Sequence, residues 1–442
     1  MPDNQAQGLV ARIYGNLVRL LGGKAASAVL GLGYMVIATH VLGPADYGVL
    51  VLVHTFAMTV GGIVEFPGWH AIVRYGAQAL ADDDHPRMLR LLRFAGLVEA
   101  AGGLASILSA AILAPLIGPR LGWSPTAIAF ALPYSFAVLG SIRATPAGYL
   151  QLLGRFDLLG LHNLVPPAVR LVGAGIAAWL GLGLKAFLVA WLIAALAEWA
   201  VMWLLGIIAV RRTLRDPVLL GTVRGAVREN PGLWRFMLAA NADVTLTELA
   251  ARIAPLFVGW ILGPAAAGLY AVAQRAAVVI QQPAQIMGQA AYAELARLVA
   301  GGGSGQALRA ALFRCAGVAF AAATPVLLIL ALFGRQIAVA LGGAAFAGAA
   351  GLVLLLGVAR TAWLAAPPAS SALTALGRPT LSVAANLVIN LGLLPLLPLM
   401  MLGMGLTGAG WHAILQGGGA SLLLILMVLR QTRRSSAQGT IA

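Results

Sequence analysis

The sequence predicts an all-α integral membrane protein with about 12 transmembrane helices, and three observations lead to that class. Of the 442 residues 60% are hydrophobic and only 10% are charged, whereas a soluble domain carries about a quarter of its residues as charges. Apolar stretches of about 20 residues, long enough to cross a bilayer, recur along the whole chain. The charges interrupt these stretches instead of gathering on a soluble face, so a nucleic-acid-binding protein is excluded.

Twelve apolar stretches are separated by Arg, Pro, Gly or Asp residues. The first is too long for the hydrophobic part of a signal peptide, and it is followed directly by the second, so the N-terminus is predicted to be retained. Each stretch predicts one helical span. The expected spans are 16–41, 46–69, 92–117, 125–150, 156–181, 185–210, 233–262, 265–290, 308–333, 347–374, 379–402 and 406–429.

The basic residues between the spans predict the orientation of the chain. The loops on one side hold only Arg120, Lys185 and Arg335. Because basic loops stay on the cytoplasmic side, both termini are predicted to be cytoplasmic, which agrees with an even number of spans. The other side carries Arg12, Arg19, Arg87, Arg90, Arg93, Arg155, Arg211, Arg212, Arg215, Arg224, Arg228, Arg297, Arg309, Arg378, Arg433 and Arg434.

Two short motifs recur in the same order in the two halves of the chain. Leu42-Gly43-Pro44 with Gly48 returns as Leu262-Gly263-Pro264 with Gly268, and Leu153-Gly154-Arg155 returns as Leu376-Gly377-Arg378. Each motif alone fits a tight turn or an interfacial anchor, but their paired recurrence six spans apart predicts two parallel repeats. The expected organisation is a six-helix bundle over 1–210, a cytoplasmic linker over 211–232, a second six-helix bundle over 233–430 and a short tail over 431–442.

The same motifs carry a family resemblance. The stretch from Leu42 to Gly48, its echo from Leu262 to Tyr270, and Leu376-Gly377-Arg378 with Asn386 resemble stretches of bacterial polysaccharide flippases in the multidrug/oligosaccharidyl-lipid/polysaccharide exporter superfamily. The resemblance covers essentially the whole chain. It implies two bundles related by a pseudo-two-fold axis, around a central cavity that opens alternately to each face of the bacterial inner membrane.

The resemblance also implies a substrate and partners. The substrate of such flippases is a polyprenyl-pyrophosphate-linked oligosaccharide, a repeat unit of lipopolysaccharide O-antigen or another polysaccharide, moved from the cytoplasmic to the outer leaflet. Glycosyltransferases that act before the flippase and a polysaccharide polymerase are the implied protein partners. The surrounding membrane lipid holds the polyprenyl tail.

Basic residues inside the spans are the candidates for binding a pyrophosphate. Ionisable groups at membrane depth normally face a bundle interior or a wet cavity, and Arg donates paired hydrogen bonds to phosphate oxygens. The number of acidic residues in the spans is nearly as large, yet the basic ones are spread through both halves, which favours an anionic substrate. The predicted pyrophosphate ligands are Lys24, Arg143, Arg170, Arg252 and Arg360.

Two other classes of protein compete with the flippase. An ion-coupled multidrug antiporter of the same superfamily needs acidic cavity walls, and it is the main alternative. A membrane glycosyltransferase or polymerase shares the substrate but usually has a large extramembranous loop, which is not predicted. No P-loop is present, so direct ATP hydrolysis is disfavoured, and no cofactor or metal is expected.

Several polar residues in the spans have two interpretations. Gln274, Gln281 and Gln285 share a helix face, where amides suit either sugar hydroxyls or interhelical hydrogen bonds. Glu248 and Arg252 are either a self-neutralising pair or part of a working polar stripe with Asn241 and Thr245.

Acidic residues in the spans are candidates for coupling transport to an ion. Those proposed are Glu65, Glu99, Asp243 and Glu248. Glu65 shares a helix face with His54, so the two could pass a proton, although hydrogen bonding to neighbouring groups is favoured as their role. In the loop at 82–84, three consecutive Asp residues predict a solvated acidic turn and not a metal site.

Overall fold

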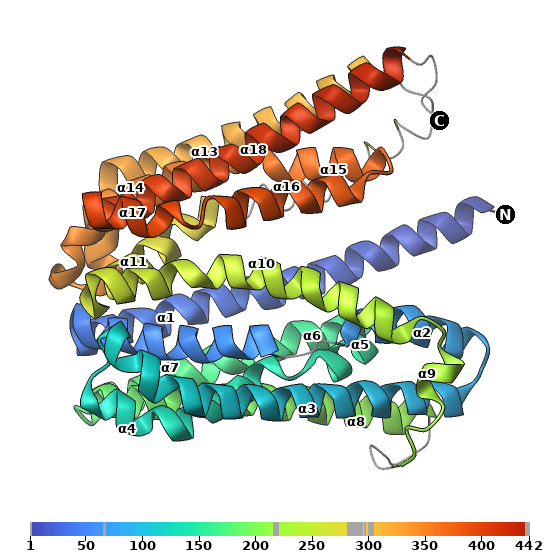
Figure 1. Cartoon of the computed structure of the whole chain (residues 1–442), viewed down its shortest axis with the longest axis horizontal. Helices are drawn as coiled ribbons and strands as arrows, with labels where there is room; N and C mark the ends of the chain where they lie inside the picture. The colour runs from blue at the N-terminus through green and yellow to red at the C-terminus, as the bar shows by residue number, and fades with distance from the viewer. Residues whose placement is uncertain are drawn as a thin grey trace. The chain divides into compact units, whose positions relative to one another are not determined.

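The computed structural model describes the backbone of residues 2–64, 68–214, 221–280 and 305–437, together with Leu295 and Leu298. Side chains are described in these ranges except at 2–21, 239–240, 242–244, 246–251, 379 and 434–437. Every regular element in the described ranges is a helix (Figure 1). The predicted all-α class is therefore confirmed.

The chain packs as two compact units. Unit 1 consists of Met1–Leu42 and Val49–Arg252, and unit 2 consists of Gly43–Gly48 and Ile253–Ala442. This division follows packing, whereas the linker at 211–232 was inferred from charge and from the repeat, so that domain boundary stays a prediction.

Unit 1 begins with α1 (Pro2–Val64), which bends at Gly43, where the backbone is not helical. The two parts of α1 are followed by short and long helices that run back and forth through the unit. They are α2 (Trp69–Ala81), α3 (His85–Ile117), η1 (Gly118–Leu121), α4 (Pro125–Tyr134), η2 (Ser135–Ser141), α5 (Ala144–Leu152), α6 (Phe156–His162), α7 (Val165–Trp179), α8 (Leu184–Leu214) and α9 (Ala226–Glu229).

Unit 2 receives the chain through α10 (Leu233–Leu262), which passes from unit 1 to unit 2 at Arg252. Helices α14 and α18 pack on each other, as do α13 and α14. The elements after α10 are α11 (Pro264–Ala277), η3 (Val278–Ile280), α13 (Gly305–Gly342), η4 (Ala344–Ala349), α14 (Ala350–Ala362), α15 (Ala366–Ala375), α16 (Pro379–Gly392), α17 (Leu396–Met404) and α18 (Leu406–Ala437).

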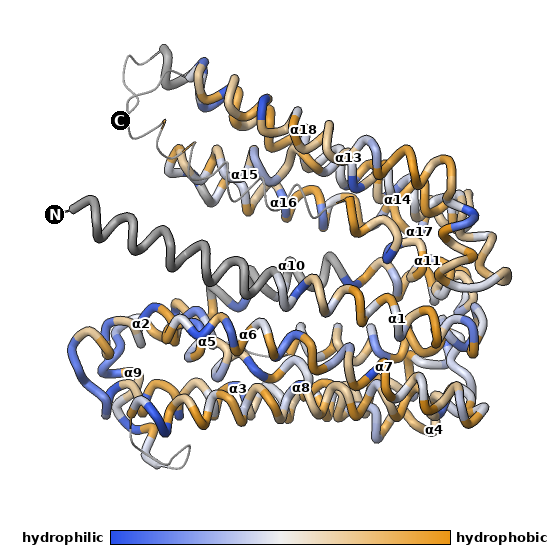
Figure 2. The backbone as a smooth tube through the Cα atoms, turned by 180° about the vertical axis from the view of Figure 1, so that it is seen from behind, coloured by the Kyte–Doolittle hydropathy of each residue, from blue (hydrophilic) through white to orange (hydrophobic). Residues whose placement is uncertain are grey.

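Among the described residues, eight segments are long and apolar enough to cross a membrane. One of them, Gly22–Val64, has 43 residues and bends in its middle. Two shorter apolar segments, Arg252–Leu262 and Pro264–Ile280, follow each other around Gly263. Figure 2 shows hydrophobic residues along the long helices α3 and α8, and hydrophilic residues at the end of unit 1 that holds α2 and α9.

The glycines of the sequence repeat have matching backbone geometry in the two units. Gly43 has φ 67° and ψ −179°, and its counterpart Gly263 has φ 85° and ψ 173°. This region of φ and ψ is open to glycine almost alone. Gly154 and Gly377, the second repeated pair, have φ of 70° and 71°. The recurrence in sequence is therefore a recurrence of local structure.

The helices that start at Pro44 and Pro264 pack closely within unit 2. A Cβ atom added to Gly48 would collide with the carbonyl oxygen of Pro264, and one added to Gly268 would collide with the carbonyl oxygen of Pro44. The contact is reciprocal, so each copy of the repeated motif supplies one proline and one glycine. Glycine is needed at both positions because backbone meets backbone there.

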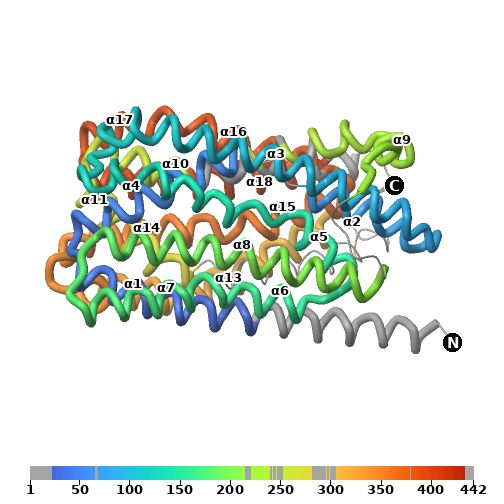
Figure 3. The backbone as a smooth tube through the Cα atoms, turned by 90° about the horizontal axis from the view of Figure 1, so that it is seen from below, coloured from blue at the N-terminus to red at the C-terminus, as the bar shows by residue number. Residues whose placement is uncertain are grey.

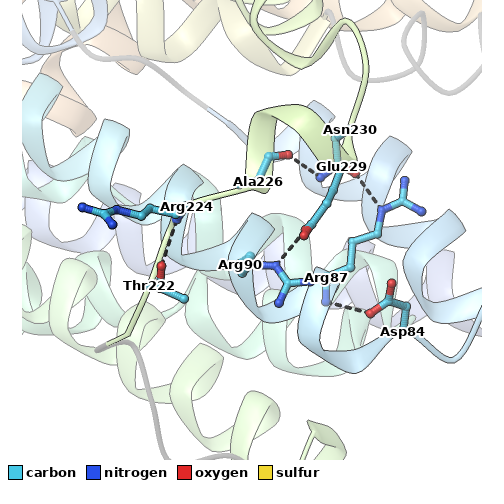
Figure 4. A network of polar contacts seen from close by, with 8 residues as sticks. All are labelled: Asp84, Arg87, Arg90, Thr222, Arg224, Ala226, Glu229 and Asn230. Atoms are coloured by element: carbon cyan, nitrogen blue, oxygen red, sulfur yellow. Dashed lines mark hydrogen bonds and ion pairs between the residues drawn. The ribbon is translucent and has the colours of Figure 1, made fainter.

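A polar network holds the chain after α8 against the start of α3 (Figure 4). Arg90 Nε lies 2.7 Å from a carboxylate oxygen of Glu229 in α9. Arg87 donates from Nε to the side-chain oxygen of Asn230 at 3.1 Å, and buried Asn230 donates to the carbonyl of Ala226 at 2.7 Å. The segment around α9 is thereby fixed to unit 1.

The acidic turn before α3 contributes to the same region. Asp84 caps the helix by accepting a hydrogen bond from the backbone N–H of Arg87 at 2.9 Å, as a carboxylate at an N-cap does. Asp82 lies 3.5 Å from the Arg87 guanidinium, and Asp83 lies 3.3 Å from His85. Two of the three carboxylates thus bond to Arg87, one to its backbone N–H and one to its guanidinium, and the third bonds to His85.

Candidate functional site

Arg170 on α7 lies at the centre of a polar cluster in unit 1. Its Nη2 atom lies 3.0 Å from Nε2 of His54, and Nδ1 of His54 lies 2.9 Å from the hydroxyl of Tyr134. Nη1 points to the hydroxyl of Tyr34 at 3.4 Å, a long contact. The cluster joins both parts of α1 to α4 and α7.

Two aromatic rings stand beside the Arg170 guanidinium. The centroids of the Tyr34 and Trp191 rings are 5.7 and 5.5 Å from its central carbon, within the range of a cation–π interaction. Trp191 comes from α8, which runs beside α7 (Figure 3). The ring faces attract the guanidinium cation, but the rings are neutral and do not balance its charge.

Arg170 has only neutral partners at hydrogen-bond distance among the described residues. Its Nε atom is buried and has no hydrogen-bond partner there. Glu198 interacts with Arg170 electrostatically at longer range, but its carboxylate forms its ion pair with Arg143, at 2.9 Å. A half-buried guanidinium with an unpartnered donor and no carboxylate in contact is suited to bind an anion.

Arg143 marks a break between η2 and α5 and is neutralised by Glu198. At the same break the fully buried Glu99 of α3 accepts hydrogen bonds from the backbone N–H groups of Ala144 and Thr145. These are the first two residues of α5, whose N–H groups have no partner within the helix. Glu99 therefore acts as a helix cap supplied from another helix.

The remaining predicted ligands of unit 1 have different surroundings. Arg252 donates from Nη1 to the carbonyl of Met58 at 2.8 Å, and it also interacts electrostatically with His54. Lys24 is exposed on α1. Arg170 and Arg252 are thus brought to the same region around His54, whereas Lys24 is on the surface of the unit.

Arg360 is the predicted ligand in unit 2. It is half-buried on α14 and interacts electrostatically with Tyr270 of α11, the helix that also holds Gln274. Gln274 is half-buried there. Gln281 and Gln285, the other glutamines proposed to bind glycan, lie outside the described residues.

Most of the proposed ion-coupling acids cannot be placed. Glu65 lies outside the described residues, and the side chains of Asp243 and Glu248 are not described. Thr245 on the same polar stripe donates to Asn241 at 3.4 Å. Glu99 is the described member of the set, and its carboxylate is occupied by backbone.

The aromatic members of the Arg170 cluster gave no signal in the sequence. Tyr34, Tyr134 and Trp191 lie in apolar stretches, where such residues usually pack in the core. His54 was noted only for its helix face shared with Glu65. The pairing with Arg170 joins positions 116 residues apart, which no local spacing reveals.

An apolar pocket of about 790 Å³ lies along α7 and α8. Among the lining residues that the structure describes, only Lys185, near the turn between the two helices, is charged. Such a lining suits a hydrocarbon chain, not a charged head group. The other lining residues are Ala168, Val169, Val172, Gly173, Ile176, Ala177, Leu182, Gly183, Ala186, Val189, Ala190 and Ile193.

Comparison with known proteins identifies relatives in sequence and in structure. The sequence profile of a family described as polysaccharide biosynthesis protein matches residues 14–297. The inner membrane protein YghQ of Escherichia coli K12 is 27% identical over 294 residues, which cover 66% of this chain and 82% of that protein.

Solved structures with the same fold belong to transporters. An inward-facing multidrug resistance MATE family transporter of the MOP superfamily has a TM-score of 0.71 at 15% identity, covering 95% of this chain and 96% of that chain. A mutant of the Vibrio cholerae MATE transporter VcmN has a TM-score of 0.61 at 14% identity, covering 97% and 98%. At this identity the likeness establishes the fold of a MOP transporter and not the substrate.

Proposed function

Because the chain belongs to the polysaccharide biosynthesis protein family, we propose that it is a flippase for a polyprenyl-pyrophosphate-linked oligosaccharide. It moves this lipid, a repeat unit of lipopolysaccharide or another polysaccharide, from the cytoplasmic to the outer leaflet of the bacterial inner membrane. The fold shared with MOP transporters supports a transport function and not an enzymatic one. The inner-membrane relative supports the location.

The proposed architecture has twelve crossings in two six-helix bundles around a central cavity, with both termini in the cytoplasm. The length of Gly22–Val64 supports two crossings, one before and one after Gly43, since one crossing takes about 20 residues. The two shorter apolar segments around Gly263 support a corresponding pair of crossings in the second half. The matched glycine geometry supports the repeat on which the two-bundle arrangement rests.

The surroundings of Arg170 are the observation that supports a negatively charged substrate. Burying a cation in a low-dielectric site costs free energy unless the cation is paired with an anion. Glu198, the described carboxylate that interacts with Arg170, forms its ion pair with Arg143 instead. A pyrophosphate oxygen would supply the missing charge and accept from the unpartnered Nε donor. Arg252 and Arg360 are proposed as further ligands, while Arg143 and exposed Lys24 contribute less.

The route of the other parts of the substrate is proposed from residue chemistry. Gln274, Gln281 and Gln285 offer amides to the sugar hydroxyls, and the polyprenyl tail stays in lipid. Alternating access then carries the head group between leaflets. Coupling to an ion through Glu65, Asp243 or Glu248 completes the proposal, with Glu99 disfavoured because its oxygens cap α5.

The function is tested in a bacterial strain that lacks its own polysaccharide flippase. We expect the wild-type gene to restore surface polysaccharide, and R170A to restore less than about a tenth of it, since a lost charged hydrogen bond costs about 1.5–3 kcal/mol. R120A, which removes an exposed arginine at the end of η1, is the matched control and should restore it fully. Full restoration by R170A at wild-type protein level would reject Arg170 as the anion ligand.

A multidrug antiporter is the second candidate, because the solved structures that share the fold include multidrug transporters. Cells that express the chain are loaded with a fluorescent organic cation, and its efflux is followed with and without an ion gradient. The flippase proposal expects no efflux above the empty vector. Gradient-driven efflux without restoration of surface polysaccharide would establish the antiporter instead.

A further inference from the structure

We propose that Arg170 and His54 form a phosphate-binding site in which the anion and a proton bind together, the proton on His54. The inference rests on the proposed function for the identity of the anion, a pyrophosphate head group. It assigns the proton to His54, which the sequence offered only as a relay partner of Glu65, and not to one of the predicted ion-coupling acids.

The hydrogen bonds of the cluster determine the protonation of His54 in the unliganded site. A guanidinium has only donors, so the Nε2 atom of His54, 3.0 Å from Nη2 of Arg170, must be the acceptor. Nε2 therefore carries no proton, and the proton of the neutral imidazole is on Nδ1, which donates to the hydroxyl of Tyr134 at 2.9 Å. The cluster as it stands requires a neutral His54.

The edge of Arg170 that His54 occupies is the edge that binds oxyanions. Elsewhere in unit 1, Arg155 donates from Nε and Nη2 to the two carboxylate oxygens of Asp157 at 3.0 and 2.9 Å. On Arg170 the same edge has a buried Nε without a partner and an Nη2 held by the imidazole. A phosphate that takes both donors displaces His54 Nε2, because charged paired bonds are stronger than one bond to a neutral nitrogen.

The charges around His54 oppose its protonation until an anion arrives. Arg170 from α7 and Arg252 from α10 both act on it as cations. The described groups facing the cluster from α1, α4 and α8 are Tyr34, Tyr134 and Trp191, which are uncharged. Glu198 of α8 interacts with Arg170 but is paired with Arg143. A bound phosphate reverses the local sign and leaves Nε2 free to take a proton and donate it to a phosphate oxygen.

The binding of anion and proton is therefore mutually favourable. By reciprocity of linked equilibria, a ligand that promotes proton uptake binds more tightly when protons are abundant. If one proton binds with each anion, the affinity for the anion falls about tenfold for each unit by which the pH rises. This holds in the range where His54 is neutral before binding and protonated after it.

Isothermal titration calorimetry of the purified full-length protein tests this linkage. The probe is farnesyl pyrophosphate, a short polyprenyl pyrophosphate, titrated at one pH in two buffers with different heats of ionisation. The difference in heat gives the number of protons taken up. We expect about one proton per bound probe in the wild type and about one fewer in H54Q, whose amide oxygen still accepts from Arg170 but does not titrate.

The control and the outcomes separate this inference from the proposed function. H40Q is the matched control, because exposed His40 lies on the same helix and, among the residues that the structure describes, bonds only to the carbonyl of Val36 in its own turn; it should match the wild type. Binding without proton uptake in the wild type, or equal uptake in H54Q, would overturn the linkage and leave the flippase intact. Failure of the wild type to bind the probe would count against the pyrophosphate substrate and the linkage together.

Discussion

At the residue scale, Arg170 illustrates what a sequence shows and what it leaves hidden. An arginine inside an apolar stretch could be identified as a candidate ligand, because such residues seldom face lipid. Its partner His54, the open Nε and the two rings depend on packing between helices far apart in the chain. The residue was predicted, but its electrostatic environment was not.

Glu99 was predicted as an ion-coupling candidate on the same grounds, and its contacts indicate another role. Its carboxylate accepts from two backbone N–H groups at the start of α5. A buried carboxylate in a sequence therefore does not distinguish a proton carrier from a helix cap. Only the position of the broken helix, 45 residues further along, separates the two.

Removal of this cap should destabilise unit 1. In E99A two buried backbone donors lose their acceptor, which we expect to cost about 2–4 kcal/mol. E99Q keeps one amide oxygen and should lose less. Thermal unfolding in detergent, followed by size-exclusion chromatography with fluorescence detection, measures the difference. An E99A variant that unfolds at the wild-type temperature would show that the cap is not needed for stability.

At the element scale, the span pattern predicted most helices but not their internal breaks. The apolar stretch at 125–150 contains α4, η2 and α5, and the stretch at 156–181 contains α6 and α7. Hydropathy does not register such breaks, since the residues remain apolar throughout. The bends at Gly43 and Gly263 were visible in sequence because glycine and proline occur together there.

These bends give a prediction about paired substitutions. Alanine at Gly43 or Gly263 must adopt a backbone conformation that only glycine adopts readily, at an expected cost of about 1–3 kcal/mol each. The repeat predicts losses of similar size for G43A and G263A. G175A is the matched control: it lies inside helix α7 with no atom near the added methyl group, and alanine favours a helix over glycine by about 1 kcal/mol.

The comparison is made by thermal unfolding of the three variants in one detergent. Unequal losses of stability in G43A and G263A would mean that the recurring motif does not stabilise the two halves equally. A loss in G175A as large as in the others would point to a general intolerance of substitution.

At the scale of the whole molecule, the chain does not divide cleanly at one point. Residues Gly43–Gly48 of α1 pack with unit 2, while α10 up to Arg252 packs with unit 1. The sequence predicted two halves from the repeat. It could not show this exchange, because the motif at 43–48 has the same residue pattern as the motif at 263–268, and nothing in that pattern tells which unit each copy packs with. Packing, not sequence order, decides which unit a segment joins.

This exchange predicts the behaviour of a split protein. Residues 253–442 expressed alone lack the segment whose Pro44 carbonyl meets Gly268. We expect this fragment to be degraded or aggregated by itself and to be recovered when 1–252 is expressed with it. Gel filtration of both preparations in mild detergent reads out the difference. A monodisperse fragment without its complement would show that the exchanged segment is dispensable.

The network on α3 has a consequence for how the protein is handled as well as for how it works. Because Glu229 bonds to Arg90 and Asn230 bonds to Arg87, the connection before α10 is held against α3 and is not a flexible linker. An affinity tag or fluorescent protein inserted between Thr222 and Asn230 would break these contacts with α3. This connection, although it lies between two long helices, is therefore a poor place for an insertion.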